Sequence, residues 1–199
     1  MNPVHLKEIT SILSYAVAMQ SERSKLLLLT LVMVCMLLPA CGTLRAIPEA
    51  TSIHVIEKVP FFSQEDYHCG PASLAMVLNF WGIPENPDDI AKEIFSESAR
   101  GTLNIDMVLY AQGKGLSADQ CKSNIGELRR FIDSGYPVIV LVDYGFYLYQ
   151  VNHFMVVTGY NDNGIIVNSG RDRDKYIPAK DFLKTWERAD FWTLLIKPR

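Results

Sequence analysis

The 199 residues are enough for one ordinary domain and a terminal segment. With 49% apolar and 21% charged residues the chain has a globular composition, which excludes a disordered protein. The formal net charge of −3, with no basic stripe, argues against a nucleic-acid partner. The densest charge cluster, residues 171–175, alternates in sign and is interpreted as a solvated turn.

The first apolar feature is an uncharged run at residues 26–38, preceded by Arg23 and Lys25. It is shorter than the roughly 20 residues of a transmembrane helix, and its flanks have the layout of a secretory signal peptide. The following Leu-Pro-Ala-Cys-Gly, residues 38–42, resembles the bacterial lipoprotein box, which implies lipidation of Cys41 after cleavage. We therefore expect a signal peptide over residues 1–40, with Met19 as an alternative start. A plain signal peptide and a signal anchor remain alternatives.

The mature chain then begins with a polar linker over residues 42–53, followed by a domain over residues 54–199. Resemblance to enterobacterial sorting, with Gly rather than Asp at position 42, favours the outer membrane, facing the periplasm. Residues 54–62 are predicted to form an edge strand, because Pro60 interrupts an apolar run.

A helix is predicted to start at the next motif, because Pro71 suits a first turn and apolar residues recur until Gly82. Cys69 therefore lies at a helix N-terminus, where free N–H groups and the helix dipole lower a thiol pKa. Gln64, five residues upstream, carries an amide able to donate to an oxyanion. The alternative is that Cys69 is a small buried hydrophobe.

Further helices are expected at residues 87–95, at 104–112 with Asn104 as cap, and from Ser123 or Asn124, where Glu127 gives capping-box spacing. A buried strand is predicted at residues 137–142, and an aromatic loop or bulged strand near a cleft at 143–151. A hairpin over residues 153–169, a helix at 179–186 and a strand at 191–197 follow. This order predicts an α+β fold, in which the helix carrying Cys69 packs on a mostly antiparallel sheet carrying His153.

Nucleophilic catalysis needs a thiolate, an imidazole, a group that orients the imidazole, and oxyanion donors. Cys69, His153 and either Asn168 or Ser169, at the end of the paired strand, supply this set. A metal site is disfavoured because two further ligands at recognisable spacing are missing, so we expect neither metal nor cofactor. Cys121 is predicted to be buried and structural, with a disulfide to Cys69 as the alternative.

Two motifs carry a resemblance to a known family: Q-x-x-x-x-C-G-P-A from Gln64 and H-F-x-V-V-x-G-Y from His153. They resemble the bacteriocin-processing, double-glycine-leader cysteine peptidases, which are papain-like. The resemblance implies Cys69 as nucleophile, His153 as general base and acid, and Gln64 with the Cys69 N–H as oxyanion donors.

The chain departs from that family in two places. The aspartate that orients the histidine would fall sixteen residues after His153, where this chain has Ser169. A register change of one residue would bring Asn168 into place instead; we favour Asn168, although a slip reverses which side chain faces inward. The exporter members also carry transmembrane and ATP-binding domains after the peptidase, whereas this chain has no P-loop motif and is expected to stand alone.

The sequence thus predicts a lipid-anchored cysteine peptidase of the bacterial envelope. Its expected partners are a peptide or protein substrate and the membrane, through the N-terminal lipid. Two alternatives stay open: a cell-wall amidase or acyl transferase with the same residues, and a non-catalytic, peptidase-like binding lipoprotein.

Overall fold

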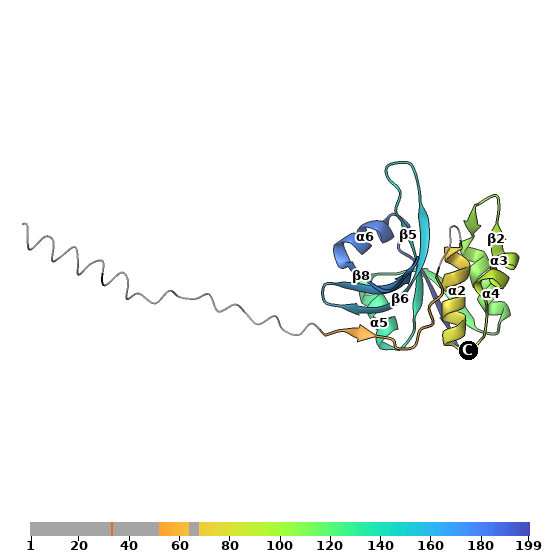
Figure 1. Ribbon diagram of the computed structural model, residues 1–199, viewed down its shortest axis with the longest axis horizontal. Coiled ribbons are helices and arrows are strands. Elements are labelled where there is room, and N and C mark those ends of the chain that lie inside the picture. Colours follow the sequence, from red (N-terminus) through yellow and green to blue (C-terminus); the bar gives the residue numbers. More distant parts are fainter. Residues whose placement is uncertain (1–32, 34–51, 64–67) are drawn as a thin grey trace, which may run out of the picture. The chain divides into compact units, whose positions relative to one another are not determined.

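The computed structural model describes residue 33, residues 52–63 and residues 68–199 (Figure 1). The chain divides into two units, Met1–Glu49 and Ala50–Arg199, and the second contains the whole domain described below. Across these described ranges, no helix has the length and hydropathy needed to cross a membrane. Apart from Met33, the expected signal peptide lies outside the described residues, as do Cys41 and Gln64.

The centre of the domain is an antiparallel sheet of seven strands in the order β4-β9-β5-β6-β7-β8, with β1 paired to β6. The strands are β1 (His54–Val55), β4 (Ser117–Lys122), β5 (Val138–Asp143), β6 (Asn152–Asn161), β7 (Gly164–Ser169), β8 (Asp172–Pro178) and β9 (Trp192–Lys197). A separate antiparallel pair is formed by β2 (Phe95–Ser96) and β3 (Gly101–Thr102).

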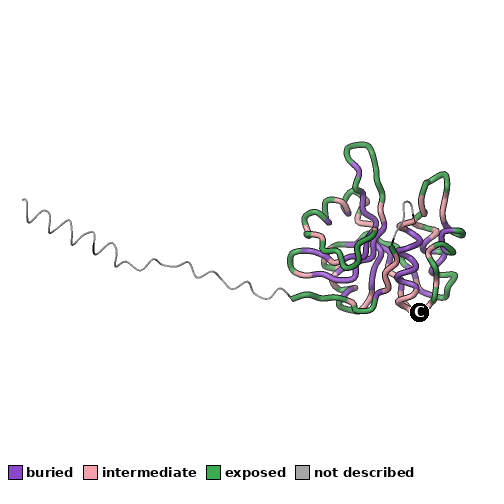
Figure 2. The backbone as a smooth tube through the Cα atoms, in the orientation of Figure 1, coloured by how far each residue is buried: buried purple, intermediate pink, exposed green. Residues whose placement is uncertain are grey.

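Five helices accompany the sheets: α2 (Cys69–Phe80), α3 (Pro87–Ile94), α4 (Asn104–Gly113), α5 (Ile125–Asp133) and α6 (Ala179–Glu187). In α2, residues 70–78 are all buried, so this helix is surrounded by the domain on every side (Figure 2). The α5 helix begins with the predicted capping box, in which Asn124 and Glu127 each satisfy the backbone N–H of the other.

Two hydrophobic cores cover the two faces of the sheet. Successive side chains of a strand point to opposite faces, and β5 and β6 divide their residues accordingly. Ile139 and Val156 belong to the core that contains the buried face of α2, whereas Val140 and Met155 belong to the core that contains Trp186 of α6. The predicted α+β, papain-like arrangement of a cysteine helix on a mostly antiparallel sheet is therefore confirmed.

Several local predictions differ from the structure. The predicted cap Asn104 is instead the first residue of α4, and Leu103 occupies the N-cap position without a side-chain cap. The expected strand at 54–62 is reduced to β1, since only His54 and Val55 pair with β6. The β4 strand was not predicted because Ala118 is its only buried residue, so its sequence lacks apolar alternation. Residues 172–175 are solvated, as expected, but they belong to β8, an edge strand whose charges protect it from pairing with another chain.

Candidate active site

Cys69 is the first residue of α2 and is half-buried. His68 occupies the N-cap position without a side-chain cap, and the first turn carries no acid, so the helix start leaves N–H groups available. Burial raises the pKa of the Cys69 thiol above its ordinary value, while the backbone N–H groups of Phe154, Gly70 and Cys69 itself act in the opposite direction. The predicted lowering of this pKa is therefore wrong, because loss of hydration outweighs the helix terminus.

Gly70 allows α2 to begin close to the small sheet. A β-carbon at this position would lie 2.8 Å from Cβ of Thr102 and 2.9 Å from its Oγ1. These distances are too short for ordinary packing, so any other residue would force the two elements apart. The glycine thus fixes how close Cys69 lies to β3.

His153 is the second residue of β6 and is opposite Val142 of β5. Its Nε2 lies 2.9 Å from Oγ of Ser169, and its ring centroid lies 5.8 Å from that of Tyr144. Burial, with a smaller contribution from the positive charge of Lys175, lowers the pKa of His153 from 6.5 to about 4. Because Ser169 occupies Nε2, the ring nitrogen left for a proton transfer is Nδ1.

Asn168, the favoured orienting residue, is engaged elsewhere. Its side chain is buried, and its Oδ1 accepts a hydrogen bond of 3.0 Å from the backbone N–H of Asp174. Its Nδ2 is buried without a partner among the residues that the structure describes. The side chain that contacts the imidazole is the alternative one, Ser169. Its place follows from the β6–β7 pairing, whose register shifts between Val157 and Gly159 and so brings Ser169 to the face of the sheet that carries His153.

Cys69 and His153 line one cleft of about 800 Å³. The start of α2 and the start of β6, which are distant in the sequence, thus meet at one cleft. The small sheet and the start of α4 form one wall, and the ends of β5 and β6 form the other. The remaining lining residues are Ala99, Arg100, Gly101, Thr102, Leu103, Asn104, Leu141, Tyr144, Val151, Asn152, Phe154 and Gly170.

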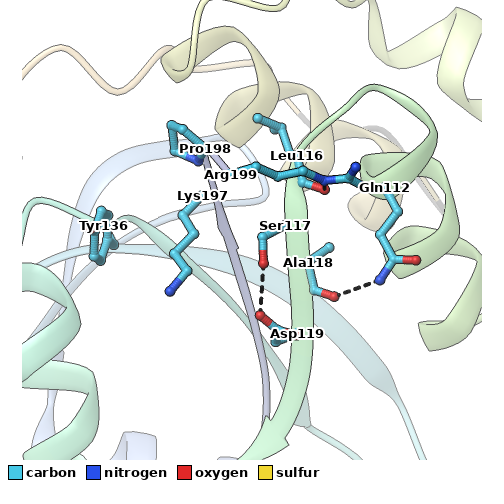
Figure 3. A pocket seen from close by; sticks show the side chains of 9 residues that line it. All are labelled: Gln112, Leu116, Ser117, Ala118, Asp119, Tyr136, Lys197, Pro198 and Arg199. Carbon is cyan, nitrogen blue, oxygen red and sulfur yellow. Dashed lines mark hydrogen bonds between the residues drawn. The ribbon is translucent and has the colours of Figure 1, made fainter.

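A second depression, of about 730 Å³, lies where β4 and β9 meet the end of α4 (Figure 3). It is polar, and its walls include hydrogen bonds from Ser117 to Asp119 and from Gln112 to the Ala118 carbonyl. None of its lining residues is a cysteine or a histidine, so it lacks a nucleophile and base of this type.

Of the other predicted residues, Gln64 and Cys41 lie outside the described residues. Cys121 is exposed rather than buried, because β4 is covered only at Ala118, and its Sγ lies 3.3 Å from Oγ of Ser123. Cys69 and Cys121 are both free thiols. Within the described part of the chain, no group of three or more histidine, cysteine or acidic side chains gathers as a metal site.

Two neighbours of His153, Tyr144 and Lys175, were not predicted from the sequence. Lys175 forms an ion pair of 2.8 Å with Asp172 and still contributes to lowering the pKa of His153. Its position depends on β8, which the sequence pattern did not predict. Tyr144 lies in residues 143–151, which the sequence predicted only as an aromatic loop or bulged strand near a cleft.

A cysteine at the start of a buried helix and a histidine on an antiparallel sheet, facing one cleft, define a papain-like cysteine peptidase fold. The family model described as "Peptidase_C39 like family" matches residues 56–193, well over half of the chain. The chain therefore belongs to the Peptidase_C39 like family, and the predicted resemblance to leader-processing peptidases is confirmed.

Solved structures share this fold. A putative C39-like peptidase from Bacillus anthracis superposes with a TM-score of 0.62 at 18% identity, covering 74% of this chain and 98% of that one, and shows the fold alone. The peptidase domain of Streptococcus ComA, a bifunctional ABC transporter, gives 0.59 at 25% identity, covering 71% and 99%. A double-glycine-motif protease from an AMS/PCAT transporter, solved with a leader peptide, gives 0.59 at 25% identity, covering 71% and 93%.

A sequence relative matches about half of the chain. An uncharacterised protein of Methanothermobacter marburgensis is 33% identical over 99 residues, which is 50% of this chain and 62% of that protein. The match thus spans less than two thirds of that relative's length.

Proposed function

We propose that the domain is a cysteine peptidase in which Cys69 is the nucleophile and His153 is the general base and acid. The observation that carries this proposal is the single cleft lined by both residues, with Nε2 of His153 held by Ser169. Family membership supports the same reaction class.

The proposed reaction begins from an uncharged pair, since the pKa of Cys69 is raised and that of His153 is lowered. Nδ1 of His153 takes the thiol proton as Sγ attacks the peptide carbonyl, and the resulting imidazolium protonates the leaving amine as the C–N bond breaks. Water then attacks the thioester with His153 as base, releasing the acid and restoring the thiol. The Cys69 N–H, and Gln64 by family resemblance, would stabilise the oxyanion.

The substrate class is a peptide or a protein. The transporter protease solved with a leader peptide supports this class, while the identity of the peptide is left to experiment. We also propose that the chain is held at the outer membrane, facing the periplasm, by a lipid on Cys41. That proposal rests on the sequence of residues 26–42.

A non-catalytic binding lipoprotein is the second candidate. The observation in its favour is the neutral Ser169 beside the imidazole, because a hydroxyl stabilises an imidazolium less than a carboxylate does.

The test is digestion of a random peptide library by the full-length protein, with cleavage sites identified by mass spectrometry. We expect Cys69→Ala and His153→Ala to reduce the rate by several orders of magnitude, as loss of either member of a nucleophile–base unit does. Cys121→Ala, which removes the other free thiol of the domain, should leave the rate unchanged. Binding of peptides without cleavage, equal in wild type and Cys69→Ala, would establish the binding protein instead.

A further inference from the structure

The loop between β5 and β6, residues 144–151, is the most exposed apolar segment of the described domain. Figure 1 shows it projecting from the sheet, and Figure 2 shows that its tip is exposed. At the tip, Phe146 is 75% exposed, Tyr147 93%, Leu148 88% and Tyr149 66%. No charged residue occurs from Tyr144 to Asn152. We call residues 144–151 the aromatic loop.

The base of the aromatic loop is rigid. The buried carboxylate of Asp143 accepts hydrogen bonds of 2.8 Å from the N–H groups of Gly145 and Val151, and it pairs with Arg188 at 3.2 Å. A β-carbon at Gly145 would lie 1.8 Å from the Tyr149 carbonyl oxygen, so the hairpin closes only with glycine there. These contacts fix the position of the base of the loop without any binding partner.

Packing within the domain does not account for the apolar side chains at the tip of the loop. Tyr147 has a backbone φ of +54°, a conformation that glycine or asparagine adopts at lower cost. Its side chain is almost wholly in solvent, so core packing does not explain an aromatic residue there. Phe146, Tyr147 and Leu148 are also absent from the lining of the catalytic cleft.

We propose that the aromatic loop inserts into the interfacial region of a lipid bilayer. Tyrosine favours the boundary between headgroups and acyl chains, where its apolar ring and its polar hydroxyl are both accommodated. Phenylalanine and leucine beside it supply apolar area for burial, and an uncharged loop enters this region at low cost. The hydrogen bond of 3.0 Å from the Tyr149 N–H to the Phe146 carbonyl satisfies part of the backbone that would be buried. The lipid proposed on Cys41 gives an independent reason for this chain to be near a bilayer.

Insertion would place the cleft at the membrane surface. Tyr144 and Val151, at the base of the aromatic loop, line the cleft that contains Cys69 and His153. A consequence, which rests on the proposed peptidase function, is that the substrates are segments lying close to the bilayer. The insertion itself requires no catalysis.

The experiment uses the full-length chain reconstituted into vesicles of phosphatidylethanolamine and phosphatidylglycerol. A fluorescent reporter is introduced by Leu148→Trp, and the matched control is Leu109→Trp, at a 57% exposed position on α4. Emission is measured relative to the wild type, whose three tryptophans give the background. We expect nitroxide-labelled lipid to quench Leu148→Trp and aqueous iodide to quench it poorly, with the reverse for Leu109→Trp. Added salt should change neither result, because the aromatic loop is uncharged.

Two results would overturn the proposal. One is equal quenching of the two variants by labelled lipid. The other is protection of Leu148→Trp from iodide quenching in the absence of vesicles. Protection that grows with protein concentration would assign the loop to contact with a second copy of the chain. Protection that appears on addition of peptide would assign it to substrate binding. Repeating the measurement in Cys69→Ala separates it from catalysis, since insertion should persist there even if no peptidase activity is ever found.

Discussion

The helices α2 and α5 begin in opposite ways. The start of α5 is secured by the capping box of Asn124 and Glu127, although only Leu128 and Ile132 of that helix are buried. The start of α2 has no side-chain cap, although most of that helix is buried. The N–H of Gly70, the second residue of the helix and one that a cap would use, faces the Cys69 sulfur instead, as does the N–H of Cys69 itself.

The capped start of α5 contributes to stability, whereas the uncapped start of α2 leaves its N–H groups to the Cys69 thiol. Two of the histidines that the structure describes, His54 and His153, repeat this contrast. His54, outside the cleft, lies 2.9 Å from the carboxylate of Asp133 and stacks on Tyr160. His153, in the cleft, has a hydroxyl as its partner and a lysine nearby. His153 thus lacks the carboxylate partner that would stabilise its protonated form, whereas His54 has one.

The largest expected effect tests whether burial alone secures α2. Leu74→Ala removes a side chain that is fully buried, and the resulting cavity should lower the free energy of unfolding by about 2–5 kcal/mol. Leu109→Ala, at an exposed position, should change it by less than about 0.5 kcal/mol. Urea unfolding of both variants measures the difference, and equal midpoints would show that α2 does not depend on the core.

The second effect concerns the cost of placing His153 in the cleft. Its folded pKa of about 4 is below the unfolded value of 6.5, so the unfolded state binds the proton first as the pH falls. Stability should therefore decline from about pH 6.5 to pH 4, by at most about 3 kcal/mol, and then level off for this group.

The measurement is the free energy of unfolding across that pH range for wild type minus His153→Gln, which cancels the other titrating groups. Ser169→Asp supplies a negative charge beside the imidazole, so it should raise the pKa of His153 and reduce the decline. A difference that does not vary with pH would contradict the buried, neutral imidazole.

The third effect tests the cap of α5. Asn124→Ala should cost about 1 kcal/mol, since it leaves an N–H of the first turn unpaired. Asn104→Ala is the matched control, because Leu103 rather than Asn104 occupies the N-cap position of α4, where no side chain caps the helix. Similar losses in thermal or urea unfolding would mean that the capping box has no special role.

The smallest effect is expected from giving α2 a side-chain cap like that of α5. His68→Asp adds a carboxylate at the free helix start and should stabilise the fold by about 0.5–1 kcal/mol. The same charge should raise the pKa of the Cys69 thiol further and slow its alkylation by iodoacetamide, followed at Cys69 by peptide mass spectrometry. Faster alkylation would show that the helix start and the thiol do not compete.

The sequence allowed the fold class, the start of α2 and the capping box to be predicted, because each depends on local signals: apolar periodicity, Pro71 and the Asn124–Glu127 spacing. It did not reveal β4 and β8, which are mostly exposed and lack the alternation that marks a strand. The contact of Ser169 with His153 depends on register shifts among β6, β7 and β8, which no local pattern specifies. The pKa of Cys69 depends on burial by distant segments, which a helix position cannot report.

The position of β9 has a consequence for the order of events during synthesis. This strand, residues 192–197, pairs on one side with β4 and on the other with β5. A ribosome must therefore release residues 192–197 before β4 can join the rest of the sheet, and until then β4 and β5 each present an unpaired edge. Truncation before residue 192 would leave two open edges, and such edges favour aggregation.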